Sequence, residues 1–549
     1  MIRKDLETRL KQAVTRLISE KRLPDGDYSV EISEPAQPEF GDFATNFALS
    51  ASRIAKKPPQ EIAETLVSEV QKDPEIASAT VAGPGFINLR LTDAYFAKWG
   101  AKAYETEEGI GRIQKEHPKK ILVEYVSVNP NGPIHCGHGR GAAYGETLCR
   151  VLEAYGEKVS REFYVNDSTN SLQMQLFALS VKARYCELLG LPAEFPKEGY
   201  RGEYVDDLAK KIRQLYGDDK AKEGLEFWQP VSQNLMLEQQ KKDLEDFGVK
   251  FDTWFSEQQL YDSGEVDRAI ELLKQRGYAY EKEGALWLKS TAFGDDKDRV
   301  LVRADGQKTY IASDVAYHKN KFDRGFDHLI NVWGADHHGY IARTKAAVQA
   351  LGYCADRLEI IITQMVRFLK DGLIVPMSKR SGDLVPLREL IENVGVDVAR
   401  FFYLMRSHDA HMDFDLDLAA EHSERNPVYY VQYAHARICS VLAKAREAGF
   451  APDPKALKEL THEAERKLVK RIWDLPYEIE RCVQDRGVHR LTTYALELAR
   501  DYHNFYDKCR VINPSDLDTT KARLALCVAT RHALRATFHL LGISAPEKM

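Results

Sequence analysis

The sequence predicts an α/β fold, a doubly wound parallel sheet that follows a small α/β module and precedes an all-α segment. Three observations support this prediction. Apolar, β-branched runs alternate with helical runs from about residue 121, the first 117 residues mix both patterns, and the pattern from about residue 395 is helical throughout. The length of 549 residues leaves room for three or four domains with their own cores.

The N-terminal module is expected to span residues 1–117. A helical pattern over the first 22 residues is followed by a strand-like run at 27–32, helical runs at 45–55 and 59–72, and a strand-like run at 80–91. A polar connector with a proline, residues 115–120, marks the boundary to the next domain.

The central domain is expected to span residues 118–395, with a charged, mostly helical insertion at about 190–260. Its expected strands lie at 121–128, 158–165, 285–288, 328–333 and 358–366. Helical runs follow the first two strands, and this β-α-β-α alternation is typical of a parallel, doubly wound sheet. Residues 396–549 are expected to form a separate all-α domain.

Composition excludes several classes of protein. The chain carries 77 Lys+Arg against 83 Asp+Glu, a net charge of −6, and 44% of its residues are hydrophobic. No apolar run is long enough to cross a membrane, and the N-terminus lacks a secretory signal pattern. The eight cysteines are scattered without a C-x-x-C pair, which argues against a disulfide framework or a thiolate zinc site. We therefore expect a cytoplasmic protein without a membrane partner.

The clearest chemical signal is the sequence HCGH at 135–138, where the first strand of the central domain leads into its first helix. A helix N-terminus offers free N–H groups and partial positive charge to phosphates. His135 and His138 project from one side of the first turn, and Gly137 leaves room for a nucleotide against the backbone. His and Gly number only 16 and 34 in the chain, so a chance H-x-G-H at this junction is improbable.

A second signal is the sequence PMSKR at 376–380, which follows the last expected strand of the sheet. A loop with hydroxyl and cationic groups could stabilise the charge that develops on a departing pyrophosphate. Taken alone it could equally be a polar surface turn; the histidine motif favours the functional interpretation.

HCGH resembles the HIGH signature of class I aminoacyl-tRNA synthetases, and PMSKR resembles their KMSKS loop, with Pro376 in place of the first lysine and Arg380 in place of the final serine. Further segments are similar to arginyl-tRNA synthetases, a family that commonly lacks the first loop lysine. These are EYVSVNP at 124–130, TYIASD at 309–314, WGADHHG at 333–339, YVQYAHAR at 430–437, GDFATN at 41–46 and GPGFIN at 83–88. The resemblance extends over effectively the whole chain.

The resemblance implies a Rossmann-like catalytic domain, an additional N-terminal module that contacts the tRNA D-loop, and an anticodon-binding C-terminal domain. It implies ATP-dependent activation of L-arginine to arginyl-adenylate and transfer of arginine to the 3′ end of tRNA(Arg), by a monomer. Mg²⁺ is expected to bind mainly through the ATP phosphates, without a metal site of the protein. The resemblance also implies a dependence of activation on bound tRNA.

The resemblance also implies a role for individual residues. The expected catalytic residues are His135, His138, Lys379 and Arg380. The expected ATP contacts are Pro130, His135, Gly137, His138, Met377, Ser378 and Lys379. The expected arginine-binding residues are Glu124, Asn129, Tyr310, Asp314 and Asp336. The expected tRNA contacts are Phe86, Asn88, Tyr430, Tyr433 and Met549.

Physical chemistry supports part of the arginine assignment. A guanidinium group carries a permanent charge, and its pocket needs at least one carboxylate. Glu124 lies in the strand that enters the histidine motif, and a buried unpaired carboxylate there is hard to explain as structural. Asp314 would share a face with Tyr310 if the segment is helical, although it could instead be a carboxylate at a helix start. His337 and His338 lack further ligands at metal-site spacing and are expected in a loop beside the substrate.

Aromatic residues suggest where RNA binds. Tyr429, Tyr430 and Tyr433 begin the all-α segment, and exposed aromatics stack on unpaired bases. Any one of them could instead pack between helices. Phe86 and Asn88 could likewise be a strand-core aromatic and a strand-edge amide.

Three alternative functions stay open. A class I synthetase for another amino acid is disfavoured by Glu124 and Asp314. A noncatalytic tRNA-binding relative is disfavoured by the intact His135, His138 and Lys379. A small nucleotidyltransferase would share the H-x-G-H chemistry but leave the N-terminal module and the all-α tail without a purpose.

Overall fold

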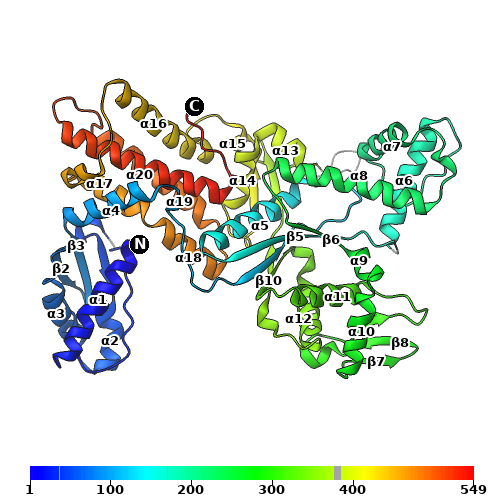
Figure 1. Cartoon of the computed structure of the whole chain (residues 1–549), viewed down its shortest axis with the longest axis horizontal. Helices are drawn as coiled ribbons and strands as arrows, with labels where there is room; N and C mark the ends of the chain where they lie inside the picture. Colours follow the sequence, from blue (N-terminus) through cyan, green and yellow to red (C-terminus); the bar gives the residue numbers. More distant parts are fainter. Residues whose placement is uncertain (36, 170, 376–384) are drawn as a thin grey trace.

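The computed structural model describes residues 1–35, 37–169, 171–375 and 385–549. It shows an N-terminal module, a central parallel sheet with two attached subdomains, and a long C-terminal helical bundle (Figure 1). None of the helices in these ranges is both long and apolar enough to cross a membrane.

The N-terminal module is a three-stranded antiparallel sheet covered by helices. Its elements are α1 (Ile2–Ser19), β1 (Phe43–Thr45), α2 (Phe47–Ala55), α3 (Pro59–Val70), β2 (Ile76–Ala82), β3 (Phe86–Leu91) and α4 (Asp93–Thr106), with strand order β1-β3-β2. Buried Leu6, Leu10 and Leu17 recur at helical spacing along α1, as the sequence pattern requires. The predicted strand at 27–32 is wrong, because pairing near this segment is limited to one isolated bridge, Ser33 with Ala44.

The central sheet has five parallel strands in the order β11-β10-β4-β5-β6. These are β4 (Lys120–Glu124), β5 (Lys158–Val165), β6 (Thr253–Ser256), β10 (His328–Gly334) and β11 (Leu358–Thr363). Chain connections leave β4 in one direction through β5 to β6 and then return to its other side as β10. The predicted doubly wound sheet is therefore confirmed, with its switch point between β4 and β10, where such sheets bind ligands.

Two helical layers flank this sheet. The helix α5 (Cys136–Ala154) connects β4 to β5, and α12 (Ile341–Ala350) connects β10 to β11. The predicted insertion forms an arm of three helices, α6 (Leu172–Leu188), α7 (Glu203–Tyr216) and α8 (Leu225–Asp246), with a hydrophobic core of its own. It ends before residue 260, because β6 already belongs to the central sheet.

A second subdomain lies between β6 and β10. It contains α9 (Glu257–Asp262), α10 (Glu265–Gln275), α11 (Tyr310–Asp323) and an antiparallel sheet of β7 (Ala279–Lys282), β8 (Ala285–Leu288) and β9 (Arg299–Val302). The strand predicted at 285–288 is thus real but does not join the parallel sheet. Periodicity finds a strand without naming its partner, and here the turn at Gly284 pairs it with its neighbour.

The C-terminal part begins with a small mixed unit and ends in five long helices. The unit consists of β12 (Val366–Lys370), β13 (Leu373–Val375), α13 (Leu387–Val394), α14 (Val396–Leu404), β14 (Met412–Asp415) and α15 (Leu416–Ala420). The bundle consists of α16 (Pro427–Glu447), α17 (Glu463–Ile472), α18 (Leu475–Asp485), α19 (Arg490–Lys508) and α20 (Leu517–Leu541). Because β14 pairs in parallel with β12, the prediction of helix throughout from residue 395 is wrong at this strand.

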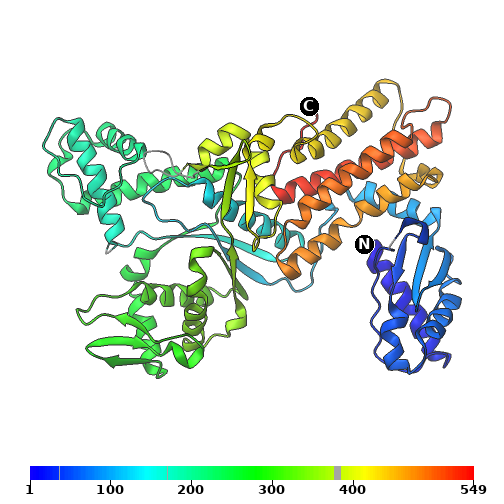
Figure 2. The same cartoon turned by 180° about the vertical axis from the view of Figure 1, so that it is seen from behind.

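The N-terminal module packs on the C-terminal bundle rather than on the central sheet (Figures 1 and 2). The Trp99 and Trp473 rings meet edge to face at 4.9 Å, and Trp473 Nε1 donates to the Trp99 carbonyl at 2.9 Å. One hydrophobic core continues from this module through the bundle into the central sheet. The two ends of the chain are therefore joined by close packing.

Two buried ion pairs attach α11 to the central sheet. Lys321, fully buried, donates to Glu124 Oε2 at the end of β4 (2.5 Å) and to Asn331 Oδ1 on β10 (3.0 Å). Glu162 on β5, also fully buried, accepts two hydrogen bonds from Arg324 (2.6 and 2.9 Å). Buried carboxylates need such partners, because a desolvated charge without one is strongly unfavourable.

We predict that Lys321→Met lowers the free energy of unfolding by about 3–5 kcal/mol, because it leaves Glu124 buried without its counter-charge. The double variant with Glu124→Gln should recover most of this loss. Denaturant unfolding of the parent, both single variants and the double variant measures the effect. A single Lys321→Met variant as stable as the parent would contradict the prediction.

Candidate functional site

The first signature lies at the start of α5, beside the switch point of the sheet. His135 is the residue that precedes the helix and His138 lies in its first turn, with ring centroids 3.4 Å apart. Burial lowers the pKa of His135 to about 4, and burial and His135 together lower the pKa of His138 to about 3. Both imidazoles are therefore neutral near pH 7, and neither Nδ1 hydrogen-bonds to a described residue. Each ring keeps one N–H to donate.

The second signature falls outside the described residues, and so do the predicted Met377, Ser378, Lys379 and Arg380. The chain immediately after it pairs with the first signature. Cys136 N donates to Val385 O at 2.9 Å, and Leu387 N donates to Ile134 O at 2.7 Å. Segments far apart in the sequence thus meet beside His135.

The loop between β4 and α5 has a constrained backbone. Val126 (φ +70°) and Ser127 (φ +42°) both adopt left-handed conformations, which for a β-branched residue such as Val126 is a true outlier. The Ser127 hydroxyl donates to Glu124 Oε1 at 3.0 Å and accepts from Tyr164 N at 3.1 Å. These contacts turn the chain sharply at the switch point, before the buried Pro130.

Asn129, predicted to bind the amino-acid end of the substrate, already has two side-chain partners. Its Nδ2 donates to Gln173 Oε1 at 2.9 Å, and its Oδ1 accepts from Asn166 Nδ2 at 3.1 Å. Its predicted role stays a prediction, and a substrate contact through Oδ1 would use the second lone pair.

A group of acidic side chains faces the end of β4 from the second subdomain. Tyr310 and Asp314 both lie in the first turns of α11, as the helical interpretation of this segment requires, and Tyr310 is 59% exposed. Burial, Glu257 and Glu124 raise the pKa of Asp314 to about 7. Asp314 is therefore near the midpoint of its titration at neutral pH.

Sequence reasoning missed Glu257, the first residue of α9. Its side chain is 2% exposed, and Oε2 has no hydrogen-bond partner among the described residues. Burial and Asp167 raise its pKa, while Ser313 and Tyr164 lower it. An acidic residue at a helix start has an ordinary explanation in the helix dipole, so the sequence gave no reason to single it out. Only the parallel pairing of β6 with β5 brings it to the pocket.

Two other predicted arginine ligands already have partners in the structure, and their role stays a prediction. Glu124 is buried, but Lys321 and Ser127 already occupy its carboxylate oxygens. Asp336 lies in the short helix η5 (Ala335–Tyr340), where its side chain is 80% exposed and pairs with His337 at 3.5 Å. Asp314 and Glu257 differ from both, because neither forms an ion pair with a described residue. No cluster of three metal-ligating side chains occurs in the described part of the chain.

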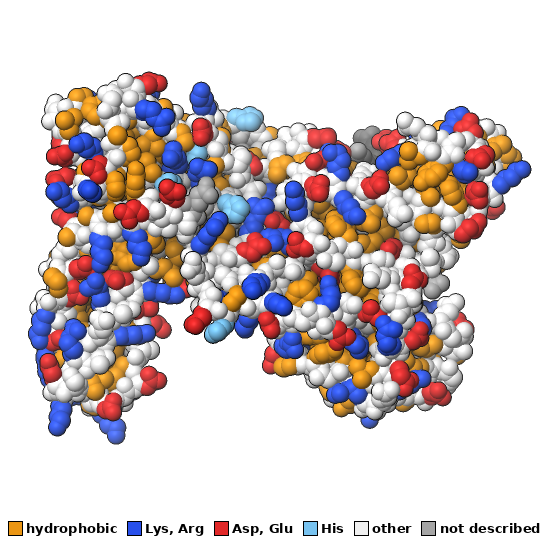
Figure 3. Space-filling model, viewed as in Figure 1, with side chains coloured by type: hydrophobic (Ala, Val, Ile, Leu, Met, Phe, Trp, Pro, Cys, Tyr) orange, Lys and Arg blue, Asp and Glu red, His pale blue; other side chains and the backbone are white. Residues whose placement is uncertain are grey.

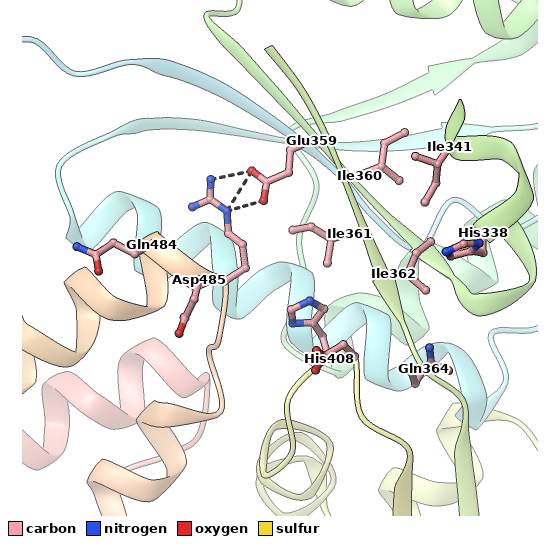
Figure 4. A pocket seen from close by; sticks show the side chains of 12 residues that line it. His338, Ile341, Glu359, Ile360, Ile361, Ile362, Gln364, His408, Gln484 and Asp485 are labelled. Carbon is pink, nitrogen blue, oxygen red and sulfur yellow. Dashed lines mark hydrogen bonds and ion pairs between the residues drawn. The ribbon is translucent and has the colours of Figure 1, made fainter. Parts of the chain in front are cut away.

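A separate cavity of about 460 Å³ lies beside β11 (Figure 4). Its lining includes His338 and His408, but neither His135 nor His138. It separates the sheet edge from the helical bundle, and Arg486 crosses it to contact Glu359 (Nη2–Oε2 2.8 Å). Its lining has acidic, basic and apolar side chains without one dominant character, which marks an interdomain gap bridged by an ion pair.

The surface gives no simple electrostatic guide to a partner, because basic and acidic side chains are interspersed over the face in Figure 3. The tyrosines of α16 form a more specific feature. The Tyr429 and Tyr433 rings stack at 6.2 Å with an angle of 11°. Arg437 donates to the Tyr433 hydroxyl at 2.9 Å and lies over its ring.

The remaining predicted RNA contacts are split between surface and interior. Phe86 is 42% exposed at the start of β3, and Met549 is 51% exposed at the end of the chain. His435 Nδ1 donates to the Pro546 carbonyl at 2.8 Å, so the last residues lie along α16, which also carries Tyr430. Asn88, in contrast, is only 8% exposed within the N-terminal sheet.

Comparison with known proteins matches all three regions of the chain. Residues 4–91 match the arginyl tRNA synthetase N-terminal domain, 103–402 match the class I (R) tRNA synthetase catalytic domain, and 431–549 match the DALR anticodon binding domain. An arginine–tRNA ligase of Bacillus subtilis is 46% identical over 99% of this chain and 98% of its own. One of Carboxydothermus hydrogenoformans is 47% identical over 95% of both chains.

Solved structures agree on the fold. The Thermus thermophilus arginyl-tRNA synthetase superposes over 100% of both chains with a TM-score of 0.75 at 22% identity. The neutral histidine pair at the switch point of the sheet therefore stands in a chain that matches its relatives from end to end. This chain belongs to the arginyl-tRNA synthetase family.

Proposed function

We propose that this protein is an arginine–tRNA ligase that activates L-arginine with ATP and transfers it to the 3′ end of tRNA(Arg). The observation that carries this proposal is the pair of carboxylates, half-buried Asp314 and buried Glu257, close to Glu124 at the end of the strand that leads to the first signature. The three alternative functions raised by the sequence leave this arrangement without a purpose.

The acidic pocket is chemically suited to a guanidinium group. Glu124 is neutralised by Lys321, whereas Asp314 and Glu257 have no cationic side chain bound to them among the described residues. A permanently charged guanidinium can donate to both carboxylates at once, and Tyr310 can cover it from the exposed side. The substrate would thus supply the positive charge that the folded chain lacks.

ATP would bind over the start of α5, where the positive end of the helix dipole favours phosphate charge. His135 and His138, both neutral, would donate one hydrogen bond each to phosphate oxygens, with Pro130 and Gly137 against the nucleotide. Met377, Ser378, Lys379 and Arg380 stay predictions, with Lys379 and Arg380 neutralising the departing pyrophosphate. Mg²⁺ would enter on the phosphates of ATP.

The reaction needs no nucleophile from the protein. An oxygen of the arginine carboxylate attacks the α-phosphorus in line, the bond to the bridging oxygen breaks, and pyrophosphate leaves. A 3′-terminal ribose hydroxyl of the tRNA then attacks the carbonyl carbon of arginyl-adenylate and AMP leaves. Catalysis is therefore positioning together with stabilisation of phosphate charge.

We assign the N-terminal module, residues 1–117, to the D-loop of tRNA and residues 396–549 to the anticodon, with the catalytic domain between them. Phe86, Tyr430, Tyr433 and Met549 are accessible enough to contact RNA, whereas Asn88 would need to act through its strand. The packing of α4 on the bundle would make these two surfaces one continuous body. Action as a monomer in the cytoplasm completes the proposal.

The central experiment is ATP–pyrophosphate exchange with each amino acid, with and without total tRNA. We expect exchange with arginine only. Asp314→Asn should raise the KM for arginine about 100-fold or more, since it removes half of a desolvated charge pair. Asp323→Asn, on the exposed end of the same helix, is the control and should behave as the parent does. Exchange with another amino acid would refute the pocket assignment.

Arginine binding should depend on pH near neutrality. The pKa of Asp314 in the empty pocket is about 7, so below that pH the carboxyl group must release a proton before it can pair with the guanidinium. We expect affinity about tenfold weaker at pH 6 than at pH 8. Calorimetry in two buffers of different ionisation enthalpy should show proton release at pH 6.5, and Asp314→Asn should abolish it. An unchanged pH dependence in that variant would exclude Asp314 as its source.

A tyrosine of α16 should contribute to tRNA affinity. Base stacking on an aromatic ring provides about 1–3 kcal/mol, so Tyr433→Ala should raise the KM for tRNA about 5- to 100-fold without changing arginine binding. Tyr216→Ala, which removes a more exposed tyrosine on the arm (43% exposed), is the control. Aminoacylation kinetics with varied tRNA concentration measure both, and an equal effect of the two substitutions would contradict the assignment.

A further inference from the structure

The helix α8, in the arm inserted between β5 and β6, reaches back to the first signature (Figure 1). Gln240 on this helix is fully buried. Its Nε2 donates to the carbonyls of Asn129 (3.0 Å) and Gly132 (2.7 Å), which are the two ends of the turn before the signature. A single side chain thus closes that turn.

The same face of α8 carries an ion pair to a different part of the chain. Asp243 is three residues beyond Gln240 and 1% exposed, and its Oδ1 accepts from Arg388 Nε at 2.7 Å. Arg388 also contacts Asp246 Oδ2 at 2.7 Å. An ion pair with one buried partner is costly to break, so Arg388, which belongs to α13, is held firmly against α8.

Arg388 lies in the first turn of α13, and that helix start is paired with the signature itself. Leu387 N donates to Ile134 O, and Cys136 N donates to Val385 O, on either side of His135. The contacts of α8 therefore fix the segment 129–136 at both ends, directly through Gln240 and indirectly through Arg388.

We propose that α8 sets the position of His135 through its contacts with the segment 129–136. Gln240, Asp243 and Arg388 are then positioning residues for adenylate formation. This inference rests on the proposed function for its chemical consequence. In-line transfer depends on the placement of the histidines to within a fraction of an ångström, and a shift of about 1 Å can cost about 100-fold in rate. The arm would then serve the chemistry of the sheet and not only enlarge the surface.

The kinetic test compares Asp243→Asn, Arg388→Gln, Arg388→Lys and the Asp243→Asn/Arg388→Gln double variant in the full-length chain. The control is Glu238→Gln, which removes an exposed carboxylate from the same helix. We expect Arg388→Gln to lower the kcat of arginine- and tRNA-dependent exchange about 10- to 100-fold, with the KM for arginine within about twofold of the parent. Arg388→Lys should recover part of the loss, and the double variant should be no slower than the slower single variant.

A second measurement tests the positioning role of α8 independently of catalytic activity. Hydrogen exchange followed by mass spectrometry should show faster exchange at residues 134–138 and 387–390 in Arg388→Gln, with the last turns of α5 and the Glu238→Gln variant unchanged. Equal hydrogen exchange at residues 134–138 in the parent and in Arg388→Gln overturns the proposal. A loss of activity that is explained entirely by a smaller folded fraction also overturns it. If the parent shows no arginine-dependent ATP–pyrophosphate exchange, but Arg388→Gln still speeds hydrogen exchange at residues 134–138, the proposed function is wrong and the positioning role of α8 is supported.

Discussion

The negative charge near the end of β4 is only partly neutralised within the folded chain. The carboxylates of Glu124, Asp314 and Glu257 lie close enough together to raise the pKa of Asp314, and Lys321 forms an ion pair with Glu124 alone of the three. The pKa values of the other two are raised, so that Asp314 can hold a proton near pH 7. In the proposed function, a bound guanidinium would replace that proton. Stability and substrate choice therefore share the same group of side chains.

The helix α5 is held in place by hydrogen bonds to residues that come much later in the sequence. Arg140, on α5 two residues after His138, is 2% exposed and donates to the carbonyls of Gln364, Ser407 and Ala410. Burial lowers its pKa to about 10, which leaves it charged. Arg400 on α14 likewise donates to the carbonyls of Leu541 and Phe247. Charged hydrogen bonds to backbone carbonyls thus join the sheet to the helices that would read tRNA, which couples the two regions mechanically.

Local pattern predicted most of the fold, and pairing decided what it could not predict. The parallel sheet follows from β-α alternation, and the site at its switch point follows from the doubly wound order, so His135 and His138 could be located from the sequence. The strand at 285–288 was assigned to the wrong sheet because periodicity does not identify a partner strand, and β14 was missed within a segment predicted to be helical. Glu257 was missed for the same reason, since it reaches the pocket only through the register of β6. Glu124 was recognised as buried, but its partner Lys321 is distant in sequence.

In the proposed function, selectivity for arginine would follow from the same electrostatics. A neutral amino acid of similar shape would leave Asp314 and Glu257 desolvated without a counter-charge, and sites built on buried polar groups reject such analogues strongly. Lysine carries a charge, but its ammonium is a compact point charge that cannot present the planar fork of a guanidinium to two carboxylates on different helices. The two acids lie on α9 and α11, both outside the parallel sheet, so specificity and phosphate chemistry are built on separate elements. In the proposed function, the subdomain between β6 and β10 would therefore select the amino acid, whereas the start of α5 would bind the phosphates of ATP.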